Sequence, residues 1–128
     1  EAMATFELIE DRNAVYKQCD ARTLIADNSW NAGIVCGAAK QVPAEMELNG
    51  LNGRLSVNGK ERAEGPTDNP MGALAWLANL AVHRNRPMTS GMVVITGSVV
   101  ATLPIEPGDH FVFELNEIGR SELRLTAD

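Results

Sequence analysis

The segment at residues 70–84 constrains the fold most, because it is the one stretch of the chain with a clear helical pattern. Asp68 or Asn69 can cap its amino terminus, and Pro70 suits the first turn, where its missing N–H costs nothing. Apolar residues occur on nearly every side of this segment. A helix of that kind is typically buried, so we predict one main buried helix with Trp76 in the core.

Short apolar runs separated by turn residues fill the rest of the chain and predict strands. Asn58-Gly59 is the best hairpin signal, because both residues tolerate positive φ between two strand-like runs. We expect an α+β fold with a β-rich mixed sheet or roll, forming a single domain over residues 1–128. The expected strands are 6–9, 14–19, 32–36, 54–57, 60–63, 92–95, 99–105, 110–115 and 122–126.

Charge and hydropathy exclude several classes of partner. The net charge is −6 and the basic residues are scattered, which disfavours nucleic acid and anionic membrane surfaces. No apolar run approaches the roughly 20 residues that span a bilayer, and no signal peptide is visible. Cys19 and Cys36 lack Cys-x-x-Cys spacing, so a reduced cytoplasmic pair is favoured over a disulfide.

The residues themselves offer few catalytic constellations. No glycine-rich phosphate loop is present. His83 and His110 are far apart and lack the spacing of metal ligands, so we interpret them as a cation at a helix end and a strand residue. Glu45 and Glu47 have the spacing of a metal-binding pair, but an exposed strand face is the favoured interpretation.

Five motifs, in order along the chain, resemble those of the 2-keto-4-pentenoate hydratase and 4-oxalocrotonate decarboxylase family, within the fumarylacetoacetate hydrolase superfamily. Together they span nearly the whole sequence, and the resemblance is to the carboxyl-terminal half of such proteins. The motifs are FELIEDR (6–12), ADN (26–28), NP with ALAWLAN (69–79), MVVITGS (92–98) and PIEPGD (104–109).

The resemblance implies a magnesium or manganese ion, held by three carboxylates, that polarises a 2-keto acid and stabilises its enolate. Two carboxylates of the family come from an upstream Glu-x-Glu motif, which has no counterpart ahead of Glu7. The third matches Glu7, with Glu10 less favoured. Because one carboxylate holds magnesium poorly, we expect weak or absent metal binding by this chain. A solvated or salt-bridged strand residue is the alternative interpretation of Glu7.

The same resemblance implies a substrate site. Thr96, Gly97 and Ser98 are similar to a turn beside the substrate, where a hydroxyl and backbone N–H groups bind oxygen; a plain β-turn is the alternative. Asp27 and Asn28 match an active-site loop. The bulky Trp30 stands where that loop has small residues in the family, which puts the usual pocket in doubt.

Two functions follow as alternatives. The first is a hydratase- or decarboxylase-like protein for small 2-keto acids, incomplete or inactive as this chain alone. The second is a non-catalytic module that keeps the fold, has lost the metal site and binds a small ligand or another protein. Because half a core leaves apolar faces open to water, we expect the chain to self-associate.

Overall fold

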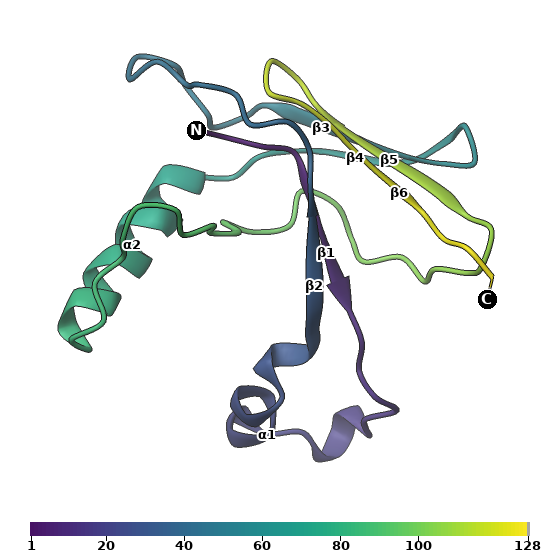
Figure 1. Ribbon diagram of the computed structural model, residues 1–128, viewed down its shortest axis with the longest axis horizontal. Coiled ribbons are helices and arrows are strands. Elements are labelled where there is room, and N and C mark those ends of the chain that lie inside the picture. Colours follow the sequence, from purple (N-terminus) through teal and green to yellow (C-terminus); the bar gives the residue numbers. More distant parts are fainter. Residues whose placement is uncertain (128) are drawn as a thin grey trace.

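The structure, a computed structural model, describes residues 1–127 as two antiparallel sheets with a main helix (Figure 1). The two-stranded sheet joins β1 (Thr5–Ile9) to β2 (Asn31–Cys36). The four-stranded sheet has the order β4 (Lys60–Pro66), β3 (Asn52–Val57), β5 (His110–Leu115) and β6 (Gly119–Arg124). The helices are α1 (Ala21–Ala26) and α2 (Pro70–His83), and short 3-10 turns cover Tyr16–Gln18 and Asn28–Trp30.

The β3–β4 hairpin turns at the predicted position. Asn58 and Gly59 both have positive φ, at 53° and 75°, and the adjacent residues Val57 and Lys60 pair across the turn. The Asn58 side chain also ties this turn to β5, because its amide donates to Asp109 at 2.8 Å while its Oδ1 accepts from the His110 N–H at 2.9 Å. The turn therefore joins β3 to β4 and also holds the start of β5. The predicted hairpin turn at Asn58-Gly59 is confirmed.

The core lies on one face of the four-stranded sheet, where the two-stranded ribbon crosses it. Leu55 and Val57 alternate along β3, and Phe111 and Phe113 alternate along β5, so all four side chains point to the same buried face. Phe6 of β1 packs edge-on against both phenylalanines, with ring centroids 6.5 and 6.2 Å apart. The alternation of apolar residues along these strands thus determines which face of the sheet is buried.

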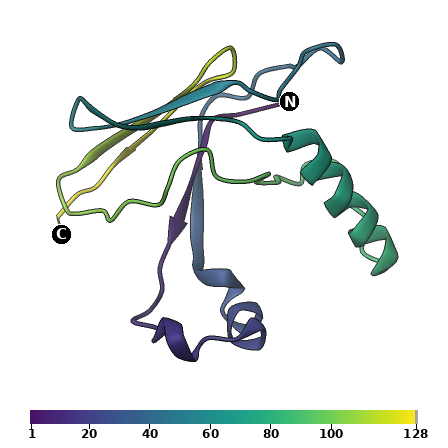
Figure 2. The same ribbon diagram turned by 180° about the vertical axis from the view of Figure 1, so that it is seen from behind.

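The ribbon and the four-stranded sheet are joined close to β6. The buried Ser121 hydroxyl of β6 donates to the Val35 carbonyl of β2 at 2.8 Å. Beyond this junction the ribbon runs away from the sheet and carries α1 at its far end, as both ribbon views show (Figures 1 and 2). The segment at residues 10–30 therefore projects from the body of the molecule.

Helix α2 has the predicted extent but not the predicted burial. Asn69 caps it, with its side chain accepting from the Gly72 N–H at 3.2 Å. No residue of α2 is buried, and Trp76 is 66% exposed, so the prediction of a core helix and a core Trp76 is wrong for the described residues. The reason is that the chain returns along only one side of the helix, and no described element covers the rest (Figure 2). No helix in the described part of the chain is long and apolar enough to cross a membrane.

Several predicted strands are also corrected. Residues 14–19 do not pair with β1; a 3-10 turn lies there, and α1 occupies the apolar run at 23–26. Residues 92–95 and 99–105 have no regular secondary structure and join no described strand. The predicted α+β class with one main helix is confirmed, and its β-rich part consists of two antiparallel sheets. Each error has one cause, since an apolar run becomes a strand only where a partner strand can hydrogen-bond to it.

Candidate functional site

A cavity of about 480 Å³ lies between β1 and residues 95–105, over the inner face of β3 and β5. Most of its lining is apolar, including Phe6, Leu55 and Phe111. Glu7 is the single charged residue in this lining. Small-molecule sites typically combine a mostly apolar lining with a few polar groups in this way. We call it the Glu7 cavity.

Glu7 is fixed by a neighbouring strand. It pairs with Ile34 across the ribbon, and the register shifts between Leu8 and Ile9, so that Ile9 lies opposite Asn31. The Asn31 side-chain amide donates to Glu7 Oε1 at 2.7 Å. One carboxylate oxygen is therefore oriented by the protein, while the side chain as a whole stays exposed at the cavity mouth.

The predicted substrate turn reaches the same cavity. Gly97 and Ser98 line it together with Glu7, whereas Thr96 and Gly97 line an adjoining cavity of about 420 Å³ beside α2. Gly97 has φ of 140°, a conformation that side-chain-bearing residues rarely adopt. The Ser98 hydroxyl donates to the Val100 carbonyl at 2.6 Å, which leaves its lone pairs as acceptors. The structure thus brings Glu7 and the 96–98 turn together.

The predicted loop residues Asp27 and Asn28 lie elsewhere. Both are at the far end of the ribbon, where Asp27 forms an ion pair with Arg12, and neither lines the Glu7 cavity. Asn28, Ser29 and Trp30 have positive φ in succession, at 48°, 51° and 63°. The structure therefore separates these two candidates from the cavity.

Trp30, whose bulk put the family's usual pocket in doubt, lies outside the lining of the Glu7 cavity. Its ring packs edge-on against Tyr16 at 5.0 Å between centroids, and its carbonyl accepts from the Glu10 N–H at 2.9 Å. Nearby, the Tyr16 hydroxyl donates to Asp11 at 2.8 Å, and this hydrogen bond raises the pKa of Tyr16. Trp30 instead closes the end of the projecting segment.

The described carboxylates, imidazoles and thiols do not assemble a metal centre. Among residues 1–127, no three His, Cys, Asp or Glu side chains lie close enough together to hold an ion. Glu45 and Glu47 lie in the irregular 45–51 loop, where Glu47 accepts from the Asn49 N–H at 2.8 Å. Cys19 and Cys36 are both free thiols.

The histidines occupy the places expected of structural residues. His83 ends α2 and is exposed. His110 begins β5, with its Nε2 atom 3.5 Å from Glu122 on β6. Both lie outside the lining of the Glu7 cavity.

Sequence reasoning missed Asn31, the partner of Glu7. No motif marks it, because its role depends on which strand pairs with β1 and in which register. The available signal was the predicted strand at 32–36, since it pairs with β1 and brings Asn31 opposite Ile9.

Comparison with known proteins identifies relatives along almost the whole chain. Residues 11–126 match the family model described as fumarylacetoacetate (FAA) hydrolase C-terminal. The sequence is 29% identical over 110 residues to the 4-oxalocrotonate decarboxylase of Pseudomonas sp. (strain CF600), covering 83% of this chain and 41% of that protein. It is 28% identical over 104 residues to the 2-oxo-hept-4-ene-1,7-dioate hydratase of Escherichia coli, covering 78% and 39%.

Solved structures give the same result for the fold. The 4-oxalocrotonate decarboxylase from Pseudomonas putida G7, complexed with magnesium and adipate, superimposes with a TM-score of 0.84 at 25% identity, covering 96% of this chain and 48% of that one. Its complex with calcium and acetate gives a TM-score of 0.82. The chain therefore spans less than half the length of the relatives it matches.

Proposed function

Because the chain belongs to the fumarylacetoacetate hydrolase C-terminal family, we propose that it forms part of a hydratase- or decarboxylase-like protein for small 2-keto acids. Its relatives are hydratases and decarboxylases with substrates of that kind in their names. Within this proposal, the 128 residues contribute one wall of the substrate site and are inactive by themselves.

One observation carries the proposal, namely that Glu7 and the turn at Gly97-Ser98 line the same apolar cavity. The backbone N–H groups of residues 96–98 donate to no backbone carbonyl of the described chain, so they are available to a ligand. Such donors suit the carboxylate and keto oxygens of a 2-keto acid. The apolar remainder of the lining suits a short carbon chain.

The metal implied by the family does not fit the described donor set. Magnesium prefers several oxygen ligands in octahedral geometry, and the cavity offers one carboxylate, already hydrogen-bonded to Asn31. The ions in the solved relatives therefore do not transfer to these residues alone. This mismatch is the reason for proposing that the isolated chain does not catalyse a reaction.

The same mismatch supports a second candidate, a non-catalytic module that binds a small ligand at the Glu7 cavity. Asn31 gives Glu7 a structural partner across the ribbon, which a strand residue without any metal role would also have. The two candidates agree on where a 2-keto acid binds. They differ in whether further residues outside these 128 complete a metal site beside Glu7.

The site is tested by following backbone amide resonances while pyruvate or oxalate is added. We expect millimolar binding with shifts centred on Glu7 and residues 96–98, because the donors there are weak and few. Ser98→Ala should weaken the binding several-fold, while the matched loop variant Ser90→Ala should leave it unchanged. Shifts confined to the Asp27–Asn28 loop, or none at all, would contradict the proposed site.

Calorimetry with magnesium then tests whether the 128 residues hold a metal unaided. For the isolated chain we expect no magnesium binding tighter than millimolar, with or without oxalate, because one carboxylate does not replace the ion's waters. A micromolar magnesium site that Glu7→Gln abolishes would show instead that the 128 residues hold the metal unaided. Self-association and a cytoplasmic location stay part of the proposal.

A further inference from the structure

A β-bulge at the start of β2 turns Asn31 toward Glu7. Side chains alternate between the two faces of a strand, and residues that pair directly share a face. Glu7 pairs with Ile34, and in a regular ribbon Ala32 would be the next residue of β2 on that face. Asn31 would then point to the opposite face. The register shifts instead, so that Ile9 lies opposite Asn31, and this shift moves Asn31 to the face of Glu7.

Asn31 uses this position to hold one oxygen of the Glu7 carboxylate. Its side-chain amide donates to Oε1 at 2.7 Å, although the two residues are 24 positions apart in the sequence. A hydrogen bond to an ionised carboxylate is roughly twice as strong as one between neutral groups. Within residues 1–127, no hydrogen bond or ion pair engages the second oxygen, Oε2. Glu7 therefore offers one oxygen, rather than two, to a ligand at the cavity mouth.

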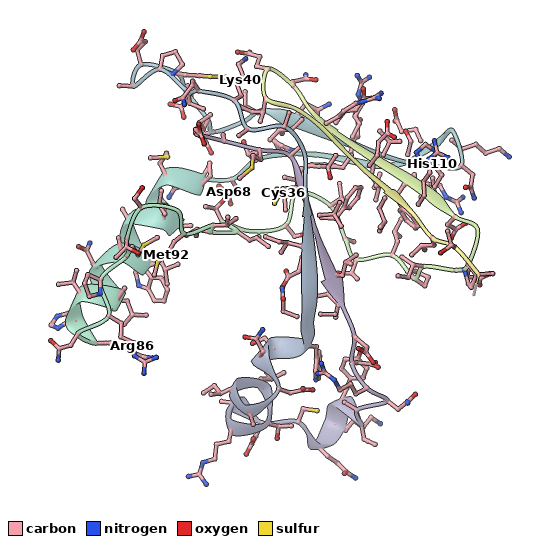
Figure 3. The ribbon with its side chains drawn as sticks, in the orientation of Figure 1. Cys36, Lys40, Asp68, Arg86, Met92 and His110 are labelled. Carbon is pink, nitrogen blue, oxygen red and sulfur yellow. The ribbon has the colours of Figure 1, made fainter. Side chains whose placement is uncertain are left out.

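The backbone that leads into the bulge is strained. The three residues before Asn31, at 28–30, all have positive φ, which persists in residues with side chains only where the surrounding structure enforces it. Figure 3 marks Cys36, the last residue of β2, at the end of the ribbon that meets the four-stranded sheet, so the bulge lies toward the projecting end. Bulges and strain of this kind concentrate at functional sites, where they redirect a side chain.

We propose that Asn31 is a positioning residue for Glu7. Its amide occupies Oε1 and fixes the orientation of the carboxylate, so that Glu7 meets a ligand through Oε2 alone. A group that needs both oxygens, such as a guanidinium or a cation bound bidentately, is thereby disfavoured. Both residues and the bulge lie on one ribbon, so the arrangement needs no covering partner. Its relevance to a 2-keto acid rests on the function proposed above, whereas the arrangement itself does not.

Manganese titrations of the 128-residue chain and its variants test the inference, with paramagnetic broadening of the backbone amide resonances around Glu7 as the readout. The unaltered chain should bind weakly, through one oxygen. Asn31→Ala frees Oε1 and should tighten binding about threefold, because the carboxylate can then chelate with both oxygens. Asn31→Asp sets a second carboxylate beside Oε1 and should tighten binding about tenfold or more. An Asn31 that only joins the two strands would not produce this order.

The controls separate the side-chain contact from a general change in charge. Asn116→Asp adds the same charge at an exposed turn residue and should leave binding weak. Adding Glu7→Gln to Asn31→Asp should remove the gain. Asn31→Gln keeps an amide donor and should bind manganese as weakly as the unaltered chain.

The same titrations can overturn the inference. Circular dichroism checks that each variant folds, and the comparison of Asn31→Ala with Asn31→Gln decides if Asn31→Asp does not. Equal manganese affinities for the unaltered chain and the folded Asn31 variants, or broadening centred away from Glu7, would contradict the assigned role. No keto acid is present in these titrations, so their failure is distinguishable from a failure of the pyruvate and oxalate titration.

Discussion

Tyr16 shows how single residues hold the projecting end of the ribbon together. It is the one tyrosine in the chain. Its ring packs edge-on against Trp30, and its hydroxyl donates to Asp11, whose Oδ1 also accepts from the Asn13 N–H at 3.0 Å. The 3-10 turns at Tyr16–Gln18 and Asn28–Trp30 are thereby joined, although neither contains a buried residue.

Because Asp11 accepts this hydrogen bond, the pKa of Tyr16 lies above the ordinary value of about 10. A raised folded pKa means that the contact stabilises the fold fully below pH of about 10 and is lost as the pH rises through the folded value. Ultraviolet absorbance of the phenolate should give one midpoint above that of free tyrosine. Asp11→Asn should lower it, and an unchanged midpoint in that variant would contradict the assigned cause.

At the scale of elements, the decisive contact is the one between the ribbon and β6. Gly37 follows β2 and passes so close to β6 that a Cβ atom there would lie 2.1 Å from the Arg120 carbonyl oxygen and 3.1 Å from that of Ala4. The buried Ser121 hydroxyl completes the junction. Backbone atoms cannot move aside as a flexible side chain can, so the junction requires glycine.

Gly37→Ala should therefore destabilise the fold by about 1–3 kcal/mol, the usual cost of overpacking. Gly33→Ala on β2 is the matched control, because a Cβ atom there meets nothing within 4 Å. That control should be neutral or slightly stabilising, since it restricts the unfolded chain. Urea unfolding of both variants measures the difference. Equal stabilities would mean that the ribbon does not dock on β6 as described.

At the scale of the whole molecule, the four-stranded sheet and the segment at residues 99–105 are held in place to different degrees. Strands β3 and β5 lie inside the four-stranded sheet and contribute Leu55 and Phe111 to the core. Residues 99–105 cover that core through Val99, Val100 and Leu103, yet their backbone makes no backbone hydrogen bond within the described chain. Side-chain packing alone thus holds one wall of the Glu7 cavity.

Hydrogen exchange should reveal this division. The amides of 99–105 should exchange quickly, and those of β3 and β5 at rates near the global unfolding limit, because only the latter are hydrogen-bonded in the sheet. Comparison of the two sets within one sample provides the internal control. Equal protection would indicate that the 99–105 backbone finds partners in solution, through a second copy or another polypeptide.

The candidate site was only partly predictable. Glu7 and the turn at 96–98 were predicted from their motifs, and Glu7, Gly97 and Ser98 line one cavity. Asp27 and Asn28 were identified in the same way and lie apart from it. The motifs give the order of these residues along the chain. How far apart the residues lie in space depends on how β1 and β2 pair.

The sequence by itself determined the local features whose energetics are local. These are the Asn58-Gly59 turn, which needs positive φ, a helix cap at Asp68 or Asn69 with Pro70 in the first turn, and the alternation that buries Phe111 and Phe113. Tertiary structure decided which apolar runs became strands and whether α2 was covered. Strand pairing and burial both require a second surface, and no short window of sequence contains the surface it will meet.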